Sequence, residues 1–209
     1  MRMLICVGIL ASITAVVDPV EAVQHNPCLP WRIMPLGDSI THGGIQGGGD
    51  PEHIRAGYRL FLGPRLSDAG FLSDFVGSLQ DGPPGTDRDH EGHNGWTSWM
   101  LRDQIGAWIA SARPDVILLV AGTNNLTGPD QVDQAAAGMT ALLDAIEAAA
   151  PSTLTLIQPI PIVTVEAAPT INPLIASYNT RVETLVRNRA ATGRPVRWVP
   201  LTWEPRWID

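Results

Sequence analysis

The residues best suited to chemistry lie in three short glycine-containing turns, each at the end of a predicted strand. The first is the Gly-Asp-Ser-Ile turn at 37–40, which directly follows a strand-like stretch at 32–36. Ser39 in this turn is exposed at the end of the strand, where its hydroxyl is available as a nucleophile. The adjoining glycine permits a tight turn whose N–H groups can face a developing oxyanion. The same residues also fit an Asp-Ser turn held by local side-chain hydrogen bonds.

The two other turns hold groups that suit the same reaction. The turn at 122–125 (Gly-Thr-Asn-Asn) follows a buried strand, and the side-chain amide of Asn124 is a hydrogen-bond donor for an oxyanion. Gly95, in the turn at 94–96, lets the backbone approach a ligand closely. Each turn alone also fits a structural role, as a strand end or a helix entry. The three together are more specific than any one of them.

These turns need a scaffold that brings strand ends together, and the rest of the chain predicts one. Strand-like and helix-like segments alternate without an internal repeat, which indicates a parallel sheet with helices on both faces. Ligands of such sheets bind at the carboxyl ends of the strands. Strands are predicted at 32–36, 71–76, 116–120, 153–157 and 196–199, and helices at 58–69, 99–112, 131–150 and 172–193.

Some of these segments have more specific signals. Residues 116–120 form a continuous apolar run, typical of a strand buried on both faces. The helix predicted at 131–150 carries an apolar stripe with helical spacing, made of Val132, Ala135, Met139, Leu142, Leu143 and Ile146. Asn172 and Pro173 fit the N-cap and the first position of the last helix. The glycine-rich segment 41–57 is predicted to be a loop at the rim of the site, and 81–95 is predicted to be a second loop.

The N-terminus is typical of a secretory signal peptide. A short basic start precedes an apolar run at 4–17, and small residues precede a cleavage site after Ala22. The run is too short for a comfortable membrane span of about 20 residues, although an N-terminal anchor is the alternative. We therefore expect a signal peptide at 1–22, a leader at 23–30, a domain at 31–209, a secreted protein and no membrane contact after cleavage.

Composition and charge indicate one globular domain and argue against a nucleic-acid-binding protein. The 209 residues include 14 basic side chains, all arginine, and 21 acidic ones, for a net charge of −7. Hydrophobic residues make up 44% of the chain, which is enough for the core of one globular domain. An acidic chain without a basic cluster does not suit nucleic acid. We expect a monomer whose partner is an acetylated polysaccharide or a small ester.

The motifs resemble those of the SGNH/GDSL hydrolase superfamily, and most of all the acetyl xylan esterases of carbohydrate esterase family 3. The resemblance rests on the stretches 33–41, 57–59, 74–78 and 89–96. It implies a flavodoxin-like three-layer α/β/α sandwich with a five-stranded parallel sheet. It also implies a secreted serine esterase that hydrolyses acetyl esters on plant cell-wall polysaccharide such as xylan.

The resemblance assigns roles to individual residues. It implies that Ser39 is the nucleophile and that the oxyanion hole consists of the Ser39 N–H, the Gly95 N–H and the Asn124 side chain. Asn125 stands where the family usually has aspartate. Four residues are expected to contact the substrate: Asp38, His42, His93 and Trp96.

The last family motif, a short Asp-x-x-His element that supplies the general base, has no counterpart, because no histidine follows His93. A serine hydroxyl is a weak nucleophile without an adjacent base. We therefore expect a C-terminally incomplete domain with slow esterase activity. The alternative is an inactive relative that retains only carbohydrate binding. His42, three residues from Ser39, is a further candidate base.

A metal site is the third interpretation, and it concerns a cluster in the second predicted loop. Its members are Asp87, Asp89, His90, Glu91 and His93. Their spacing matches no standard metal site, and a solvated acidic loop explains the same residues. The sequence therefore predicts an enzyme without a metal or other cofactor.

Overall fold

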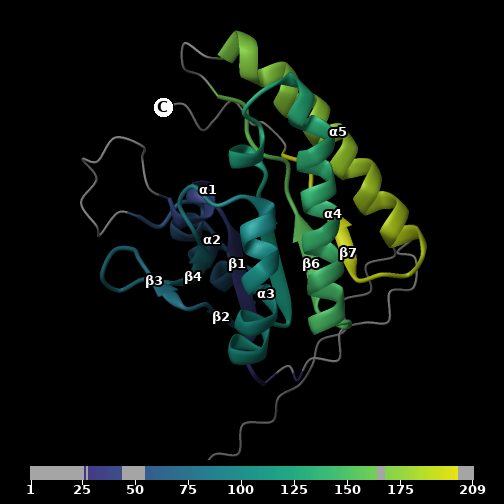
Figure 1. Cartoon of the computed structure of the whole chain (residues 1–209). Coiled ribbons are helices and arrows are strands. Elements are labelled where there is room, and N and C mark those ends of the chain that lie inside the picture. The colour runs from purple at the N-terminus through teal and green to yellow at the C-terminus, as the bar shows by residue number, and fades with distance from the viewer. Residues whose placement is uncertain (1–25, 27, 44–54, 164–167, 202–209) are drawn as a thin grey trace, which may run out of the picture.

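A mostly parallel sheet runs through the protein, as shown by a computed structural model that describes residues 26, 28–43, 55–163 and 168–201 (Figure 1). The strand order is β3-β4-β1-β5-β6-β7, and β2 pairs with the first half of β1. The β3–β4 pair is antiparallel and the other pairs are parallel. The strands are β1 (Trp31–Gly37), β2 (Ser73–Phe75), β3 (Leu79–Gln80), β4 (Asp89–Gly92), β5 (Val116–Val120), β6 (Leu154–Ile157) and β7 (Val196–Trp198).

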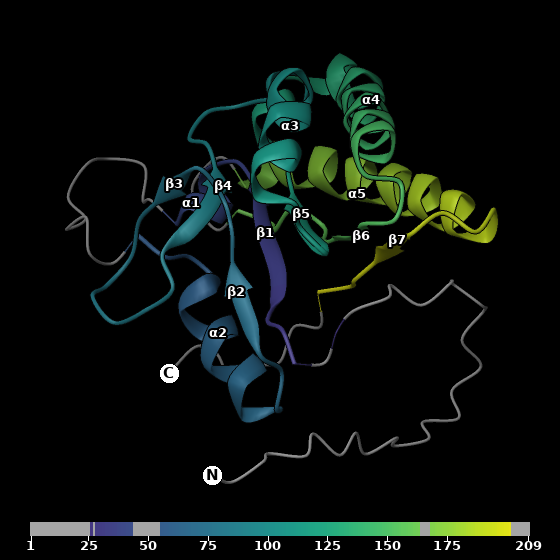
Figure 2. The same ribbon diagram turned by 90° about the horizontal axis from the view of Figure 1, so that it is seen from below.

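Helices cover both faces of the sheet, which confirms the predicted three layers. Figure 2 shows α3, α4 and α5 on one face and α2 on the other. The helices are α1 (Ser39–His42), α2 (Arg59–Asp68), α3 (Ser98–Ala112), α4 (Val132–Ala149) and α5 (Ala168–Ala191), with short 3-10 helices η2 (Thr123–Asn125) and η3 (Pro129–Gln131). None of the helices within the described ranges has the length and apolar character needed to cross a membrane.

The larger core lies between the sheet and α3, α4 and α5. Leu36 and Ile117 project into it from neighbouring strands, because alternate residues of a strand share one face. α4 contributes the stripe that its sequence predicted, all of it buried: Ala135, Met139, Leu142, Leu143 and Ile146. A smaller core, which includes Phe75 and Val116, lies on the α2 face. The alternation of faces along β1 and β5 therefore divides the apolar residues between two cores.

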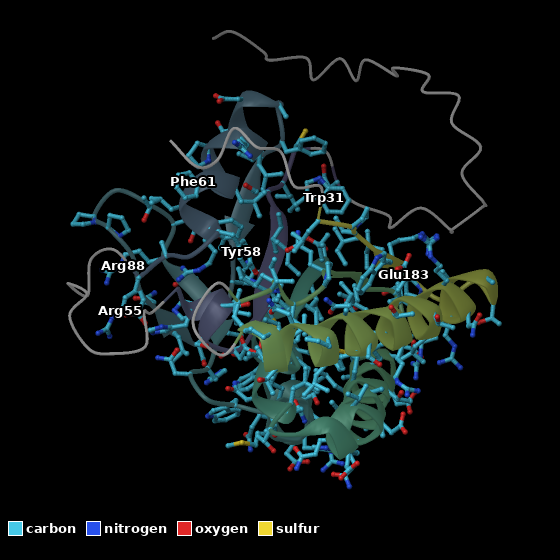
Figure 3. The ribbon with its side chains drawn as sticks, turned by 90° about the horizontal axis from the view of Figure 1, so that it is seen from above. Trp31, Arg55, Tyr58, Phe61, Arg88 and Glu183 are labelled. Carbon is cyan, nitrogen blue, oxygen red and sulfur yellow. The ribbon has the colours of Figure 1, made fainter. Side chains whose placement is uncertain are left out.

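α2 covers only part of its face of the sheet. Beside it lies an apolar groove of about 470 Å³, lined among others by Tyr58, Phe61, Leu118 and Val199. Tyr58 and Phe61 come from the start of α2 (Figure 3). Leu118 is therefore half-buried, although its strand was predicted to be covered on both faces. The difference arises because α2 leaves part of this face uncovered, where the groove lies over Leu118.

The segment 81–95 was predicted to be a loop, and this prediction was wrong in part. β4 lies within it, and β3 just precedes it. The five predicted parallel strands are present as β1, β2, β5, β6 and β7, and these two additional strands make a sheet of seven within the described residues. β4 has no apolar alternation because its inner side chains, His90 and Glu91, are polar and buried against polar partners.

The start of the last helix also differs from the prediction. α5 begins at Ala168, so Pro173 lies inside the helix. Asn172 likewise lies inside the helix and is not its N-cap. Its side chain forms hydrogen bonds of 2.9 Å with both the N–H and the carbonyl of Val163. The predicted signal peptide, half of the leader (residues 23–25 and 27) and residues 44–54 of the rim loop lie outside the described residues.

Candidate active site

Ser39 stands where β1 ends and the short helix α1 begins. Oδ1 of Asp38 caps this helix by accepting a hydrogen bond of 3.0 Å from the Ile40 N–H. Gly43 closes it in a left-handed conformation, at φ +84°, and donates its N–H to the Ser39 carbonyl at 2.8 Å. The first N–H groups of a helix have no intrahelical acceptor. The half-buried Ser39 therefore presents both a hydroxyl and a backbone donor at the end of β1.

Two glycines allow the chain around Ser39 to pack closely. A Cβ atom on Gly37 would lie 2.1 Å from the carbonyl oxygen of Val120. A Cβ atom on Gly92 would lie 2.4 Å from the backbone nitrogen of His42. Both would overlap with backbone atoms, so no side chain fits at either position. These glycines therefore let α1 lie directly against β4 and let β1 lie directly against β5.

Asp38 is buried, at 0% exposure, and lies beside Thr123. Burial raises the pKa of Asp38 above its ordinary value, and the Ile40 N–H and the neighbouring Thr123 oppose that rise. Asp38 Oδ2 and Thr123 Oγ1 nevertheless lack a partner with full hydrogen-bond geometry in the described structure. The structure shows Asp38 as a helix cap next to the 122–125 turn, and its contact with substrate stays a prediction.

The turn that carries Gly95 lies against the end of β1. The His93 N–H donates to the Gly37 carbonyl at 2.9 Å, and the Trp96 N–H donates to the His93 carbonyl at 3.2 Å. Gly95 is exposed and has φ +77°, in the left-handed region that favours glycine. The predicted glycine turn therefore reaches the chain segment that leads into Ser39.

Asn124 holds the same turn from the side of β5, and Asn125 holds the start of α3. The Asn124 Nδ2 atom donates a hydrogen bond of 2.9 Å to the Trp96 carbonyl. An amide nitrogen carries two hydrogens, so the second stays available for an oxyanion. Asn125 Oδ1 accepts hydrogen bonds from the N–H and the hydroxyl of Ser98, at the start of α3. An amide oxygen thus fills the acceptor role at this position.

The three predicted turns therefore meet at one edge of the sheet. β1 lies between β4 and β5, so the Ser39 turn is flanked by the turns of Gly95 and Asn124. Attack by the Ser39 hydroxyl on an ester would form a tetrahedral oxyanion. Hydrogen-bond donors on both sides of the hydroxyl are the arrangement that stabilises such an oxyanion. That the three groups converge on one bound oxygen stays a prediction.

His42 and His90 share one carboxylate on the α2 side of the sheet. The Nε2 atom of each lies 3.3 Å from Asp81 Oδ2, and their rings meet edge to face at 5.5 Å. Burial lowers the pKa of His42, against the attraction of Asp81, and burial lowers the pKa of His90 to about 4. His90 Nδ1 accepts the Gly92 N–H at 3.0 Å, which assigns the ring proton to Nε2. Both histidines are therefore neutral near pH 7.

None of the histidines among the described residues forms a hydrogen bond with the Ser39 hydroxyl. His42, the candidate base, is 7% exposed, and its Nε2 faces Asp81. His93 Nε2 lies 3.1 Å from Glu91 Oε1. Although His42 is only three residues from Ser39 in the sequence, its ring lies in a buried network with Asp81. Substrate contact by His42 and His93 stays a prediction.

Arg59 holds this network together, and its sequence position alone did not reveal that role. The guanidinium, 2% exposed, donates to the carbonyls of Asp81 and Arg88 at 3.1 Å each, of Arg55 at 3.1 Å and of His42 at 3.4 Å. Arg55 and Arg88 lie at the same edge of the molecule (Figure 3). The stretch 57–59 is part of the family resemblance, but the resemblance implies no role for Arg59. The structure shows that this charged group connects α1 and α2 to the loop between β3 and β4.

The residues that the metal interpretation grouped together do not point toward one common site. Successive residues of a strand face opposite sides of the sheet, so His90 faces Asp81 while Glu91 faces Ser78 and His93. Among the described residues, no three His, Cys, Asp or Glu side chains are arranged to hold a metal ion. The proton assigned to His90 Nε2 also removes the lone pair that a metal would need there. β4 thus separates the residues that the sequence places side by side.

A serine at the carboxyl end of a parallel sheet, flanked by two candidate oxyanion donors, defines an acyl or ester hydrolase. The model of the GDSL-like lipase/acylhydrolase family matches residues 36–207, and the chain belongs to this family. It is a carboxylic ester hydrolase by class. No curated protein sequence matches the chain.

Solved structures extend this comparison. The Clostridium thermocellum family 3 carbohydrate esterase is 31% identical, with a TM-score of 0.71 over 85% of this chain and 83% of that one. A carbohydrate esterase family 3 protein from Talaromyces cellulolyticus is 26% identical, with a TM-score of 0.64 over 81% and 79%. An acetyl esterase mutant with a bound acetate ion has the same values. The predicted superfamily, fold class and relation to family 3 esterases are confirmed.

Proposed function

We propose that this chain is a secreted serine esterase that removes acetyl groups from a polysaccharide such as xylan. The observation that carries the proposal is the hydrogen bond from Asn124 to the Trp96 carbonyl, which joins two of the three turns beside Ser39. The similar structures support the acyl group and the substrate class, since two of them are family 3 carbohydrate esterases and one is an acetyl esterase with acetate.

In this proposal the Ser39 Oγ atom attacks the ester carbonyl and forms a tetrahedral intermediate. Its oxyanion accepts hydrogen bonds from the N–H groups of Ser39 and Gly95 and from the second hydrogen of Asn124 Nδ2. The intermediate collapses, the alcohol leaves and the acetyl group stays on Ser39 until water removes it as acetate. One oxyanion donor of this kind contributes about 10²–10³-fold to kcat.

The attack also releases the Ser39 proton, which a general base must accept. Within the described residues no histidine is bonded to Ser39, and residues 202–209 lie outside them. We therefore expect a strong dependence on the leaving group. A p-nitrophenolate leaves without protonation, so the oxyanion hole alone supports slow hydrolysis. A sugar alkoxide needs a proton, so the rate on acetylated xylan should be very low.

The test measures p-nitrophenol release from p-nitrophenyl acetate and acetate release from acetylated xylan. Ser39→Ala should abolish the slow rate on p-nitrophenyl acetate, whereas Ser111→Ala, an exposed serine of α3, should retain it. Equal rates in wild type and Ser39→Ala would show that Ser39 is not the nucleophile. Full activity on acetylated xylan would show that a base is in place, and His42→Ala and His93→Ala would then locate it.

A second candidate function is carbohydrate binding without hydrolysis. It is favoured by the absence of a histidine bonded to Ser39 among the residues that the structure describes. Calorimetric titration of the Ser39→Ala variant with acetylated xylo-oligosaccharides tests it. If wild type and Ser39→Ala both bind these oligosaccharides and neither releases acetate, the result would favour the binding role over the esterase.

A further inference from the structure

The turn that carries Gly95 is open at its tip and packed at both ends. A Cβ atom on Gly95 would meet no atom within 4 Å, so packing at the tip does not hold the turn in place. The turn begins at His93 and ends at Trp96, and both of these side chains are partly buried. The position of the Gly95 N–H therefore depends on what holds His93 and Trp96.

The His93 ring packs against two indole rings, those of Trp96 and Trp108, which also lie close to each other, with 5.9 Å between their centroids. The His93 centroid is 4.4 Å from that of Trp96, with 26° between the planes, and 4.6 Å from that of Trp108, with 10° between the planes. Trp108 belongs to α3, which packs on the larger core. Stacking against both rings therefore holds the tilt of His93 and connects the turn to a rigid helix.

Glu91 determines how the His93 ring is rotated within that stack. The Glu91 carboxylate is 1% exposed, and its Oε1 lies 3.1 Å from His93 Nε2. Ser78 donates its N–H to Oε2 at 3.0 Å and its hydroxyl to Oε1 at 2.5 Å. Because hydrogen bonds to both of its oxygens fix the orientation of this buried carboxylate, they also fix the direction in which His93 Nε2 points.

Trp96 connects this stack to Asn124. Its ring packs on His93, and its carbonyl accepts the hydrogen bond from Asn124 Nδ2 at 2.9 Å. A shift of Trp96 would move both the Gly95 N–H, one residue earlier, and the amide of Asn124. Oxyanion donors act only within a narrow range of distance and angle, so a small displacement weakens them strongly.

We propose that Glu91 and His93 are positioning residues of the oxyanion hole, acting through Trp96 on Gly95 and Asn124. This inference rests on the proposed esterase function and adds to it two residues that form no hydrogen bond with Ser39 in the described structure. It gives His93 a role that differs from the predicted substrate contact. It also gives a role to the buried Glu91 carboxylate and to Ser78, both of which lie outside the three turns.

Two substitutions of His93 each remove one of the two restraints on its ring, the bond to Glu91 or the packing against the indoles. His93→Phe keeps an aromatic ring packed against the two indoles and removes the partner of Glu91, whereas His93→Gln keeps a hydrogen-bond donor and removes the ring. Both should lower kcat for p-nitrophenyl acetate about 10–100-fold with little change in KM, since oxyanion donors act in the transition state. In an Asn124→Ala background, His93→Gln should lower kcat less than in wild type, because one donor that it positions is gone.

A measurement independent of hydrolysis uses the Asn124 side-chain amide as a reporter. In ¹⁵N-labelled protein, loss of its bond to the Trp96 carbonyl should raise its solvent exchange rate about 10-fold or more in both His93 variants. Glu183→Gln, on α5 and remote from the site (Figure 3), is the matched control and should leave exchange and kcat unchanged.

The outcomes separate this inference from the proposed function. If Ser39→Ala abolishes hydrolysis but both His93 variants keep wild-type kcat and wild-type exchange at Asn124, the positioning role is wrong and the esterase stands. If Ser39→Ala has no effect on hydrolysis, the proposed function is wrong, and the exchange measurement alone decides the link from His93 to Asn124. Unchanged exchange would then overturn it.

Discussion

Asn125 Oδ1 accepts two hydrogen bonds from Ser98, one from its N–H at 3.0 Å and one from its hydroxyl at 3.1 Å. Ser98 is buried and is the first residue of α3. The two bonds join the segment after β5 to the helix that carries Trp108. A single oxygen thus connects the Asn124 turn with the stack that lies beside Gly95.

This relationship predicts opposite effects for two substitutions of Asn125. Asn125→Asp keeps the accepting oxygen and places a negative charge near the N-terminus of α3, so it should stabilise the fold by about 0.3–1 kcal/mol. Asn125→Ala leaves two buried donors of Ser98 unsatisfied and should cost about 1–3 kcal/mol. Urea unfolding at pH 7 measures both. An aspartate variant less stable than the alanine variant would contradict this account.

Removal of the Asn124 donor should slow catalysis without affecting substrate binding. Asn124→Ala should lower kcat about 10²–10³-fold. Asn124→Asp should lower it further, because a carboxylate would face both the Trp96 carbonyl and the oxyanion. Steady-state kinetics on p-nitrophenyl acetate measure both variants. A variant with raised KM and normal kcat would place Asn124 in ground-state binding instead.

Gly122 should be irreplaceable for steric reasons. It has φ +127°, and a Cβ atom there would lie 2.3 Å from the hydroxyl oxygen of Tyr178. Tyr178 is buried and donates that hydroxyl to the Ala121 carbonyl at 2.8 Å, so it cannot move without losing the bond. Gly122→Ala should therefore destabilise the fold by about 3 kcal/mol or more.

The matched control is Gly106, an exposed residue of α3 where a Cβ atom would meet nothing within 4 Å. Gly106→Ala should stabilise the fold by about 0.5–1 kcal/mol, because alanine is the better helix former. Denaturant unfolding of the two variants tests the contrast. Equal effects would show that the contact with Tyr178 does not limit position 122.

The buried histidines predict a fold that loses stability in acid. Burial lowers the pKa of His42, and burial lowers that of His90 to about 4, whereas an unfolded histidine titrates near 6.5. Below about pH 6.5 the unfolded chain therefore binds more protons, and the stabilisation present above that pH is lost as the pH falls toward 4. Each histidine contributes a slope of up to about 1.4 kcal/mol per pH unit.

Urea unfolding between pH 4.5 and 7.5, in wild type and His90→Gln, measures this slope. The variant should show a flatter curve. Burial raises the pKa of Asp38, so protonation of that carboxyl acts in the opposite direction, but Asp38 is common to both proteins. Their difference therefore reports on His90, together with its neighbours Asp81, Arg59 and His42. Identical slopes would show that His90 is not a source of acid sensitivity.

Much of the fold follows from local patterns of the sequence. The apolar run at β5 and the stripe of α4 were predicted because periodicity reflects which face of an element is buried. The positions of Ser39, Gly95 and Asn124 at strand ends were predicted for a similar reason. The glycines there allow turns, and parallel strands bring their carboxyl ends to one edge. Family resemblance then gave these positions roles.

Tertiary structure alone decided which polar side chains act together. β4 was hidden in a loop-like segment because His90 and Glu91 are buried by hydrogen bonds to Asp81 and Ser78, not by apolar contacts that leave a sequence pattern. These two neighbours look like one metal cluster in the sequence, yet a strand sends them to opposite faces. Which group faces which carboxylate depends on contacts between residues distant in the chain, and the sequence alone does not specify those contacts.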